Sequence, residues 1–515
     1  MKKKIHHTLI IIAVALTSCS LNETPRSELP EDVAYTSKET LYLNTVATLY
    51  NYIGGYEEGQ GLQGAIRGVY DLQTFGSDEA MIPLRGVDWY DGGLWQDMYK
   101  HSWTAGHDLV KNSWLYLYKV ITLCNRSLEI LETYKDLAGQ ENYQNWTAEV
   151  RAFRAMYYWY LIDLFGDVPL VTNSSVSMNE VKREKRAEVF KFCENELLSV
   201  VYFLSAENST REGDYYGRIT QPVVYFILAK LMLESEVYTG VPRWDDSILY
   251  CDELEFLNYR LEQIYQSNFI VYNQYSSENI FTIPMDKNLF SNQQQNIMRS
   301  LHYRHAAAYG YGGENGACAT LKTLQVFNYP DGPDPRFYDC YHFSYLYGPD
   351  GKTITDRTGN PLKYEPEKVQ LDLSGSPYLE TAGARMYKYA FDKNAIKDGK
   401  LIDNDIVLFR FADVLLMRAE AKERLGLDGS DDFNAVRLRA DAPARECTLD
   451  NILDERLLEL CWEGWRRQDL IRFGQYKSLY EGSDAIDESD GHTTVFPIPA
   501  DVRALNSNMT QTPGY

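Results

Sequence analysis

Several long segments of the chain repeat their apolar residues every three or four positions, which is the period of an amphipathic helix. The clearest segment spans residues 146–165 and carries apolar side chains at Val150, Phe153, Tyr157, Leu161 and Leu164. Gly166 and Pro169 follow it, and residues of these types commonly end helices. The sequence therefore predicts a fold that is mostly α-helical.

Other segments have the same period and clear ends. They are residues 220–238, 405–425 and 448–473, and we expect further helices around 36–52, 112–135, 185–204 and 245–266. Thr220 is placed to cap its helix, Pro222 lies in the first turn, and Gly240 follows the last turn. Gly426 and Gly474 end the other two segments.

Two of these helices resemble each other. Small residues such as Ala229 and Ala419 lie at helical spacing in both, with Glu234 and Glu420 nearby. This pattern is similar to tetratricopeptide-type helix pairs, in which small residues let two helices pack closely. The copies lie far apart, so long insertions must interrupt any repeats. Generic amphipathic helices are the alternative.

The region from about 268 to 400 has a different composition, rich in Gly, Tyr, Asn, Asp and Pro. Turn signals occur at Pro349-Asp350-Gly351 and at Thr358-Gly359-Asn360. We expect loops and short hairpins here, attached to the helical scaffold. Long loops on a rigid scaffold are common places for binding sites.

The N-terminus has the features of an export signal. Lys2, Lys3 and Lys4 precede a short apolar run over residues 8–16, which is too short to span a bilayer. The run ends in Leu16-Thr17-Ser18-Cys19, which resembles the lipobox of bacterial lipoproteins. We therefore predict a signal peptide at 1–18, a lipidated Cys19, and a tether over 19–35. The alternative is an ordinary signal peptide with a chance cysteine.

Charge and cysteine spacing exclude several classes of protein. The formal net charge of −22 opposes binding to nucleic acid. None of the eight cysteines forms a C-x-x-C pair, so a zinc or redox motif has no support, and the pairing of the seven cysteines other than Cys19 stays open. We predict no metal ligands. Structural calcium is conceivable with so many Asp and Asn residues, but no twelve-residue calcium loop occurs.

Several blocks of sequence resemble the SusD/RagB family of bacterial lipoproteins. No single block is decisive, but the blocks occur in the family's order along the chain, which makes the resemblance specific. They are Glu23-Thr24-Pro25-Arg26 after Cys19; Glu149-Val150-Arg151-Ala152-Phe153-Arg154-Ala155 and Phe165-Gly166-Asp167-Val168-Pro169-Leu170; Gly217-Arg218-Ile219-Thr220; Arg410-Phe411-Ala412-Asp413-Val414-Leu415-Leu416-Met417-Arg418-Ala419-Glu420; Asp454-Glu455-Arg456 with Glu459-Leu460 and Glu463-Gly464; and Phe496-Pro497-Ile498-Pro499 with Asn508-Met509-Thr510-Gln511-Thr512-Pro513-Gly514-Tyr515. They cover residues 19 to 515.

This resemblance implies a fold, a location and a function. It implies one SusD-like domain over residues 36–515, built on four tetratricopeptide-like helix pairs, with irregular ligand-side insertions at about 55–110 and 268–400. It also implies a lipoprotein on the extracellular side of the outer membrane. Such a protein captures oligosaccharides and delivers them to a SusC-like TonB-dependent transporter, without catalysis and without a cofactor. A peptide-capturing RagB-like member and a tetratricopeptide adaptor that binds only proteins are the alternatives.

Residues 77–103 hold the most unusual mixture of aromatic and charged side chains. Sugar rings have apolar C–H faces and polar rims, which aromatic rings flanked by Asp and Arg side chains match. We therefore predict that this segment contributes glycan-binding residues: Asp78, Arg85, Asp88, Trp89, Tyr90 and Trp95. The alternative is that the tryptophans belong to the core, which we expect for Trp103.

A second aromatic wall is expected from the loop-rich region. No Trp lies between residues 245 and 461, so tyrosine must supply it. Tyr309 and Tyr311, beside Gly310 and the pair at 312–313, are our candidates. The alternative is that both rings pack within turns.

Other charged groups are more simply explained by structure. We expect Arg151, Arg154 and Asp167 to form ion pairs or caps. Carboxylates at Glu455, Glu459 and Glu463 share one face of the predicted helix, and we expect them to face Arg456, Arg466 and Arg467 rather than to act as an acid and base. The spacing of His302 and His305 would suit a metal ion, but we predict a pair of surface histidines that binds no metal. No G-x-S-x-G or H-E-x-x-H motif occurs, so the sequence gives no support for an enzyme.

Overall fold

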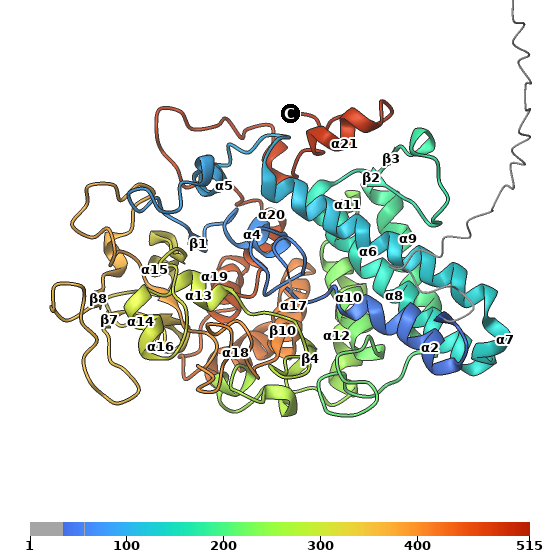
Figure 1. The fold of residues 1–515 in the computed structure, drawn as a ribbon, viewed down its shortest axis with the longest axis horizontal. Helices are drawn as coiled ribbons and strands as arrows, with labels where there is room; N and C mark the ends of the chain where they lie inside the picture. Colours follow the sequence, from blue (N-terminus) through green and yellow to red (C-terminus); the bar gives the residue numbers. More distant parts are fainter. Residues whose placement is uncertain (1–33, 56) are drawn as a thin grey trace, which may run out of the picture.

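A computed structural model describes residues 34–55 and 57–515 of the chain. The predicted signal peptide (1–18), the predicted lipidation site Cys19 and most of the predicted tether (19–35) lie outside the described residues. Helices dominate, and the long ones gather on one side of the molecule, whereas the other side is made mostly of loops (Figure 1). The prediction of a mostly α-helical fold is confirmed.

The helical side, which we call the helical body, is a series of packed neighbours. The long helices are α6 (Asp108–Thr133), α8 (Gln140–Phe165), α9 (Arg186–Val200), α10 (Gln221–Leu233), α12 (Trp244–Phe256) and α17 (Phe411–Arg424). In this series α6 packs on α8, α8 on α9, α10 on α12, and α12 on α17. Successive pairs of this kind form the tetratricopeptide-like scaffold that the sequence predicts.

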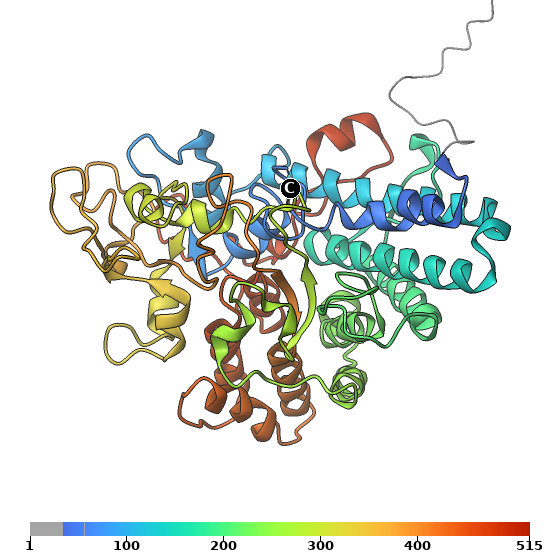
Figure 2. The same cartoon turned by 60° about the horizontal axis from the view of Figure 1, so that its bottom comes forward.

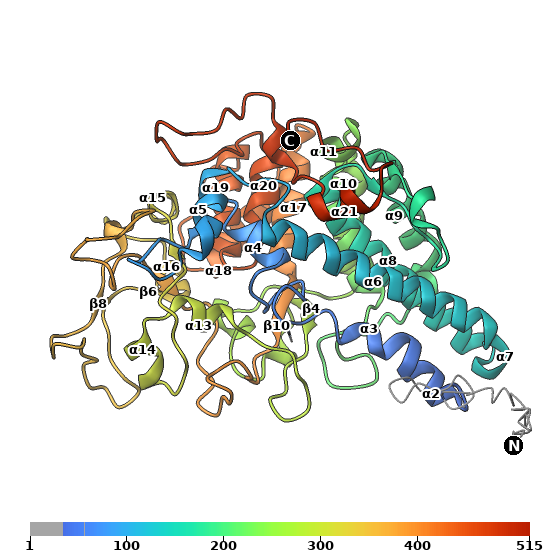
Figure 3. The same cartoon turned by 45° about the horizontal axis from the view of Figure 1, so that its top comes forward.

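Shorter helices complete the helical body and its connections. They are α2 (Lys38–Tyr42) and α3 (Thr48–Tyr50), joined by a π-helical turn at Leu43–Ala47, and α4 (Val69–Thr74), α5 (Leu94–Lys100), α7 (Lys135–Ala138), α11 (Ser235–Thr239), α18 (Ser430–Arg439), α19 (Leu449–Leu460), α20 (Arg466–Arg472) and α21 (Ala500–Leu505). In the turned view of Figure 3, α4 lies beside α20, although about 400 residues separate them in the chain.

Helix α8 shows how local signals and packing combine. Gly139 and Gly166 flank it with positive φ values of 77° and 68°, conformations that glycine adopts without steric cost. Arg154 Nη2 lies 2.7 Å from a carboxylate oxygen of Glu196 on α9, and Arg151 pairs with the same group. Asp167 accepts a 2.9 Å hydrogen bond from the first amide of α9. The predicted structural role of these charged groups is confirmed.

The predicted helix at 405–425 is wrong at its start. Residues 406–410 form strand β10 (Ile406–Arg410), which pairs antiparallel with β4 (Asn279–Ile283), and the helix begins only at Phe411. All five residues of β10 are buried, so both faces of the strand are covered. A strand buried on both faces shows no alternation in its sequence, which is why it read as part of a helix. Figure 2 shows the two strands in the middle of the molecule.

The predicted helix at 448–473 is also wrong, because it is two helices. The backbone leaves helical geometry between α19 and α20, where Trp462 has a φ of 64° and Gly464 a φ of 77°. Glu463 therefore does not continue the helical face of Glu455 and Glu459.

The partners predicted for these three glutamates are wrong as well. Glu455 pairs with Arg336 and Arg437, Glu459 with Arg336, Arg410 and Arg439, and Glu463 with Lys388 and Arg410. The expected partners are engaged elsewhere: Arg456 with Asp413 and Asp469, Arg466 with Asp78, and Arg467 with Asp163. The roles are still structural, as expected.

The other side of the molecule, which we call the loop region, consists of short elements between loops. Its helices are α13 (Asn296–Ser300), α14 (Tyr303–Ala308), α15 (Leu321–Val326) and α16 (Arg336–Cys340). Two-residue strands pair antiparallel as β1 (Ala80–Met81) with β5 (Cys318–Ala319), β6 (Tyr341–His342) with β9 (Arg385–Met386), and β7 (Ser344–Tyr345) with β8 (Lys363–Tyr364). A similar pair, β2 (Val168–Pro169) with β3 (Arg183–Glu184), lies beside α8.

The turns predicted in this region are present. Gly351 and Gly359 have φ values of 74° and 91°, and each lies between residues joined by an antiparallel bridge. The region thus forms the loops and short hairpins that the sequence predicts, although its four short helices were not anticipated.

None of the helices in the described part of the chain combines the length and apolar character that crossing a bilayer requires.

Candidate functional site

A hollow of about 310 Å³ opens in the loop region, beside α14 and α16. Its lining is almost entirely aromatic: His305, Tyr309, Tyr338, Tyr341, His342, Phe343, Tyr345, Leu346, Tyr347 and Tyr387. We call it the tyrosine hollow. Tyr338, Tyr345 and Tyr347 are each more than half exposed, so their rings are accessible to a ligand.

One short stretch of sequence supplies much of this lining. Aromatic residues occupy every second position at Tyr341, Phe343, Tyr345 and Tyr347. These residues do not lie on one face of a single extended strand, because Ser344 at the start of β7 has a φ of 61° and Tyr341 is buried whereas Tyr345 is exposed. The sequence analysis missed this concentration of aromatic residues, which was the available signal for the site.

Four aromatic rings contact one another in a continuous wall. Tyr309 lies on Phe391 with ring centroids 4.2 Å apart and planes 22° apart. Phe391 lies 5.6 Å from His342 at 17°, and His342 lies 4.1 Å from Tyr387. The hydroxyl of Tyr309 donates a 3.0 Å hydrogen bond to the carbonyl of Tyr347 across the hollow. The wall is therefore held in place before any ligand arrives.

Two imidazoles within this lining are neutral. Burial lowers the pKa of His305 to about 3, with further lowering from His302 and Arg385. Burial and the neighbouring His305 lower the pKa of His342 well below its ordinary value. Among the described residues, Nε2 of His342 has no hydrogen-bond partner.

Three of the predicted site residues form a second patch near the hollow, which we call the Trp89 patch. Trp89 is half-buried and donates a 2.9 Å hydrogen bond from Nε1 to the carbonyl of Glu314. Tyr90 is 57% exposed. Asp88 is exposed and accepts a 3.2 Å hydrogen bond from the hydroxyl of Tyr303.

The Trp89 patch and the tyrosine hollow flank the same short helix. Tyr303 is the first residue of α14, and Tyr309 directly follows its last residue. Six helical residues span about 9 Å. The two surfaces are therefore close enough for one extended ligand to contact both.

Two predicted site residues with aromatic rings do not reach the surface. Trp95 is 1% exposed and donates a 2.9 Å hydrogen bond to Asp91, while its ring packs edge-on against Phe75. Tyr311 is 4% exposed and donates its hydroxyl to the carbonyl of Asp392 at 3.2 Å. Neither ring offers a face to a ligand, so these two predictions are corrected.

Two predicted polar residues are likewise engaged within the protein. Asp78 is buried and forms a two-pronged ion pair with Arg466, with distances of 2.6 and 2.9 Å. Arg85 is buried and donates to the carbonyls of Leu379 and Ala382 at 2.7 and 2.8 Å. Burial lowers the pKa of Arg85 to about 9. Both residues hold the loops together and are not free to bind a sugar. Trp103 is buried in the core, as expected.

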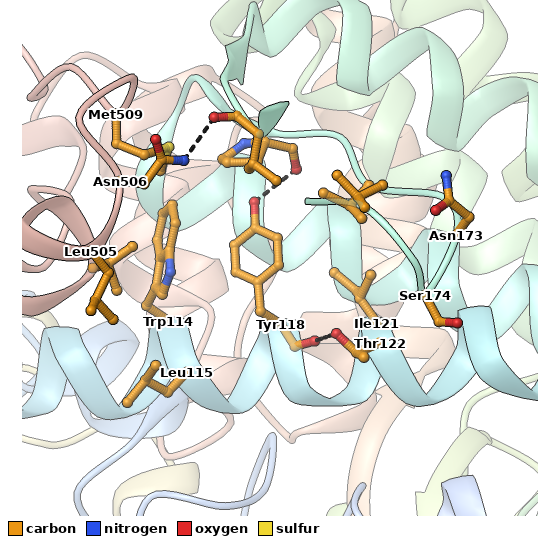
Figure 4. A pocket seen from close by; sticks show the side chains of 15 residues that line it. Trp114, Leu115, Tyr118, Ile121, Thr122, Asn173, Ser174, Leu505, Asn506 and Met509 are labelled. Atoms are coloured by element: carbon orange, nitrogen blue, oxygen red, sulfur yellow. Dashed lines mark hydrogen bonds between the residues drawn. The ribbon is translucent and has the colours of Figure 1, made fainter. Parts of the chain in front are cut away.

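A different kind of surface lies on the helical body, away from the tyrosine hollow. A groove of about 340 Å³ runs between α6, the loop around β2 and β3, and α21 (Figure 4). Its lining, predominantly apolar, is Trp114, Leu115, Tyr118, Ile121, Thr122, Pro169, Val171, Asn173, Ser174, Val176, Val181, Val502, Leu505, Asn506 and Met509. Leu505 is 73% exposed at its edge. We call this surface the apolar groove.

Neither surface resembles a metal centre. Within residues 34–55 and 57–515, no group of three or more His, Cys, Asp and Glu side chains is placed to hold an ion. The predicted surface pair of histidines is wrong, because His302 and His305 are both buried. His302 Nε2 lies 3.2 Å from Glu380, and His305 Nδ1 lies 3.1 Å from the hydroxyl of Tyr364.

A scaffold of paired helices that carries an aromatic hollow on its loop-rich side defines a ligand-binding protein. The chain belongs to the SusD family, as its sequence blocks indicate: the family's sequence model matches residues 277–515. A second model, described as "Starch-binding associating with outer membrane", matches residues 71–233.

Named relatives agree with this assignment. The chain is 26% identical to the starch-binding protein SusD of Bacteroides thetaiotaomicron, over 90% of this chain and 88% of the relative. Among solved structures, its fold is similar to a laminarin-binding SusD-like protein, with a TM-score of 0.70 and 21% identity over 93% of this chain and all of that one. It is equally similar to surface glycan-binding protein A of B. thetaiotaomicron in complex with laminarihexaose, with a TM-score of 0.70 and 20% identity over the same shares. These relatives are named for the ligands that they bind.

Proposed function

We propose that this protein captures oligosaccharides on the extracellular side of the outer membrane and delivers them to a SusC-like TonB-dependent transporter. The tyrosine hollow carries the proposal, because it gathers exposed aromatic rings around a cavity in the loop region. Its volume is at the lower end of the range that small-ligand sites occupy, about 300–1,000 Å³. It suits a few sugar units rather than a protein surface.

The chemistry of the hollow matches that of a neutral sugar. Ring faces such as those of Tyr338 and Tyr345 suit the apolar C–H faces of a pyranose. Tyrosine hydroxyls both donate and accept hydrogen bonds, as sugar hydroxyls do. The neutral imidazoles and tyrosines bring no charge that would require an ionic ligand.

The Trp89 patch extends the same site in this proposal. Asp88, Trp89 and Tyr90 lie at the opposite end of α14 from Tyr309, so a chain of several sugar units would contact both ends. Of the residues that the sequence proposed, Asp88, Trp89, Tyr90 and Tyr309 remain candidates. The names of the relatives, starch-binding and laminarin-binding, support a glucan as the first ligand to try.

The apolar groove supports the second half of the proposal. It lies on the helical body, remote from the tyrosine hollow, so a partner bound there leaves the sugar site open (Figures 1 and 4). An apolar segment of the transporter is the occupant that we propose. A lipid anchor at Cys19 would hold the protein at the membrane where this partner resides.

Calorimetry tests the sugar site. Residues 20–515 are titrated with malto-oligosaccharides, laminari-oligosaccharides and a mixture of peptides. Tyr309→Ala and Tyr345→Ala should each weaken binding of the preferred glycan by about tenfold, which corresponds to about 1.4 kcal/mol. Tyr202→Ala is the control, because Tyr202 is 82% exposed on the helical body. Binding of peptides alone would favour the RagB-like alternative, and equal affinity of all three variants for a bound glycan would rule out the hollow.

Co-purification tests the apolar groove. Leu505→Glu places a charge at its edge and should reduce recovery of the SusC-like transporter from cells that express both proteins. Leu427→Glu is the matched control, since Leu427 is 55% exposed in the loop between α17 and α18. Both variants should bind glycan as the unmodified protein does. Equal recovery of the transporter with both variants would contradict docking at the groove.

A further inference from the structure

Two cysteines meet where the loop region joins the helical body. Cys340 is the last residue of α16, and Cys461 is the residue after α19, about 120 positions further along the chain. Both are fully buried. Each thiol shifts the pKa of the other, so the two side chains are close neighbours.

Two adjacent residues donate hydrogen bonds to the carbonyls of the two cysteines, one from its backbone and one from its side chain. The amide of Tyr387 donates a 2.9 Å hydrogen bond to the carbonyl of Cys340. The ammonium group of the next residue, Lys388, donates a 2.8 Å hydrogen bond to the carbonyl of Cys461. Consecutive residues therefore fix both cysteines, independently of the sulfur contact.

Neighbouring side chains show the same proximity. The residues that follow the two cysteines, Tyr341 and Trp462, have ring centroids 5.7 Å apart. The hydroxyl of Tyr265 lies 3.3 Å from the sulfur of Cys340 and 2.9 Å from the carbonyl of Glu459, two residues before Cys461. Four separate contacts thus bring the ends of α16 and α19 together.

We propose that Cys340 and Cys461 form a disulfide bond in the exported protein. Residues 1–18 predict export from the cytoplasm, and disulfides persist in oxidising compartments outside it. The proposal does not depend on the sugar ligand.

The reaction is an exchange with a disulfide of an envelope dithiol oxidant. The thiolate of Cys340 attacks one sulfur of that disulfide and releases the other as a thiolate. The thiolate of Cys461 then attacks the mixed disulfide at the Cys340 sulfur, and the oxidant leaves as a dithiol. Two protein thiols are oxidised and one disulfide of the oxidant is reduced, so atoms and electrons balance.

A thiolate is the nucleophile in disulfide exchange. Since both sulfurs are buried in the folded protein, the exchange takes place before α16 has packed against α19.

The disulfide would link the loop region to the helical body. His342, in the lining of the tyrosine hollow, lies two residues after Cys340. Cys461 begins the break between α19 and α20. The disulfide would therefore restrain the base of the hollow relative to the helical body.

Mass spectrometry tests the proposal directly. Residues 20–515 are exported to a bacterial periplasm, purified without reductant, denatured and alkylated. Five of the seven cysteines should react, and a peptide that joins Cys340 to Cys461 should appear. The reduced protein is also refolded in a buffer of oxidised and reduced glutathione. If all seven cysteines react in both preparations, the proposal is overturned.

Thermal unfolding gives an independent result. Reductant should lower the Tm of the unmodified protein by about 5 °C, because the disulfide restrains a long loop of the unfolded chain. Reductant should have no effect on a Cys340→Ala/Cys461→Ala variant, but should still act on the control Cys251→Ala, which removes another buried thiol. If the double variant fails to fold, the peptide that joins the two cysteines still decides the question.

Discussion

The indole ring of Trp89 lies directly against Gly316, so closely that a Cβ at that glycine would sit 2.6 Å from two of the indole carbons. Trp89 itself has a φ of 65°, which is uncommon for a bulky residue, and its Nε1 is bonded to Glu314. The Trp89 ring can occupy this position only because residue 316 is a glycine, which has no Cβ.

We expect Gly316→Ala to displace the Trp89 ring. The affinity for the bound glycan should fall by about tenfold, and overpacking should cost about 1–3 kcal/mol of stability. Calorimetry and urea unfolding measure the two effects. Gly106→Ala is the control, because Gly106 is exposed and its added methyl would meet nothing closer than 3.7 Å. Unchanged glycan affinity in Gly316→Ala would remove Trp89 from the proposed site.

Trp95 and Trp89 should respond in opposite ways to truncation. Trp95 is buried against Phe75 and beneath the guanidinium of Arg299, so Trp95→Ala should lower the free energy of unfolding by about 3–5 kcal/mol. Its glycan affinity should be unchanged where the protein is still folded. Trp89→Ala should weaken glycan binding with a smaller loss of stability. Urea unfolding and calorimetry on both variants separate the two roles, and a loss of affinity in Trp95→Ala alone would contradict the assignment.

The fold was predictable where its signals are local. The end of α8 at Phe165 follows from the apolar period and from Gly166, whereas the helix begins at Gln140, before the predicted start at residue 146. Strand β10 was not predictable in this way, because its burial on both faces comes from distant elements. The break after α19 is also tertiary in origin: the amide of Trp462 donates to the carboxylate of Glu79, nearly 400 residues away in the chain.

The residues of the candidate site were likewise predictable only where the signal is local. Residue type identified Trp89 and Tyr309 as aromatic candidates, but it could not distinguish Trp89 from the buried Trp95, six residues later. Exposure depends on which groups from elsewhere cover a ring, and that information is not local. The aromatic residues from Tyr341 to Tyr347 were a local signal, but the positive φ of Ser344 interrupts the extended chain, so a period of two could not place the rings on one face.

Acid should destabilise the loop region through its buried histidines. The folded pKa of His305 is about 3, against about 6.5 in an unfolded chain, so the unfolded state binds the proton more readily. The contribution of His305 to the free energy of unfolding is therefore fully present above pH 6.5. It falls as the pH is lowered toward 3, and the loss is about 2 kcal/mol at pH 5. His302, Arg385 and the hydroxyl of Tyr364 face the imidazole, and none of them supplies a negative charge at this pH.

Thermal unfolding between pH 7.5 and pH 4.5 measures this dependence. His305→Phe keeps a ring at the position and removes its titration, so the fall in Tm on acidification should become shallower. His492→Phe is the control, because His492 lies on the C-terminal segment beside Asp490. In this variant the Tm should fall on acidification as steeply as it does in the unmodified protein. The same slope in His305→Phe as in the unmodified protein would show that another group is responsible.

Glu459 is expected to be essential for folding and irrelevant to any chemistry on the ligand. Its buried carboxylate pairs with three arginines: Arg336, Arg410 and Arg439. Burial alone would raise the pKa of this carboxyl, but the arginines hold it well below its usual range. The group is thus ionised, enclosed and fully neutralised by partners, which leaves no proton to donate and no access for a substrate.

Glu459→Gln should lower the free energy of unfolding by about 3–5 kcal/mol, because it removes the charge that compensates buried guanidinium groups. Urea unfolding measures this loss, with the exposed Glu446→Gln as a control expected within about 0.5 kcal/mol of the unmodified protein. A change below 1 kcal/mol in Glu459→Gln would contradict the structural role. Chromatography of a glycan after long incubation with the unmodified protein supplies the second readout. Intact glycan is expected, and cleavage that disappears in Glu459→Gln would turn this buried carboxylate from a structural group into a catalytic one.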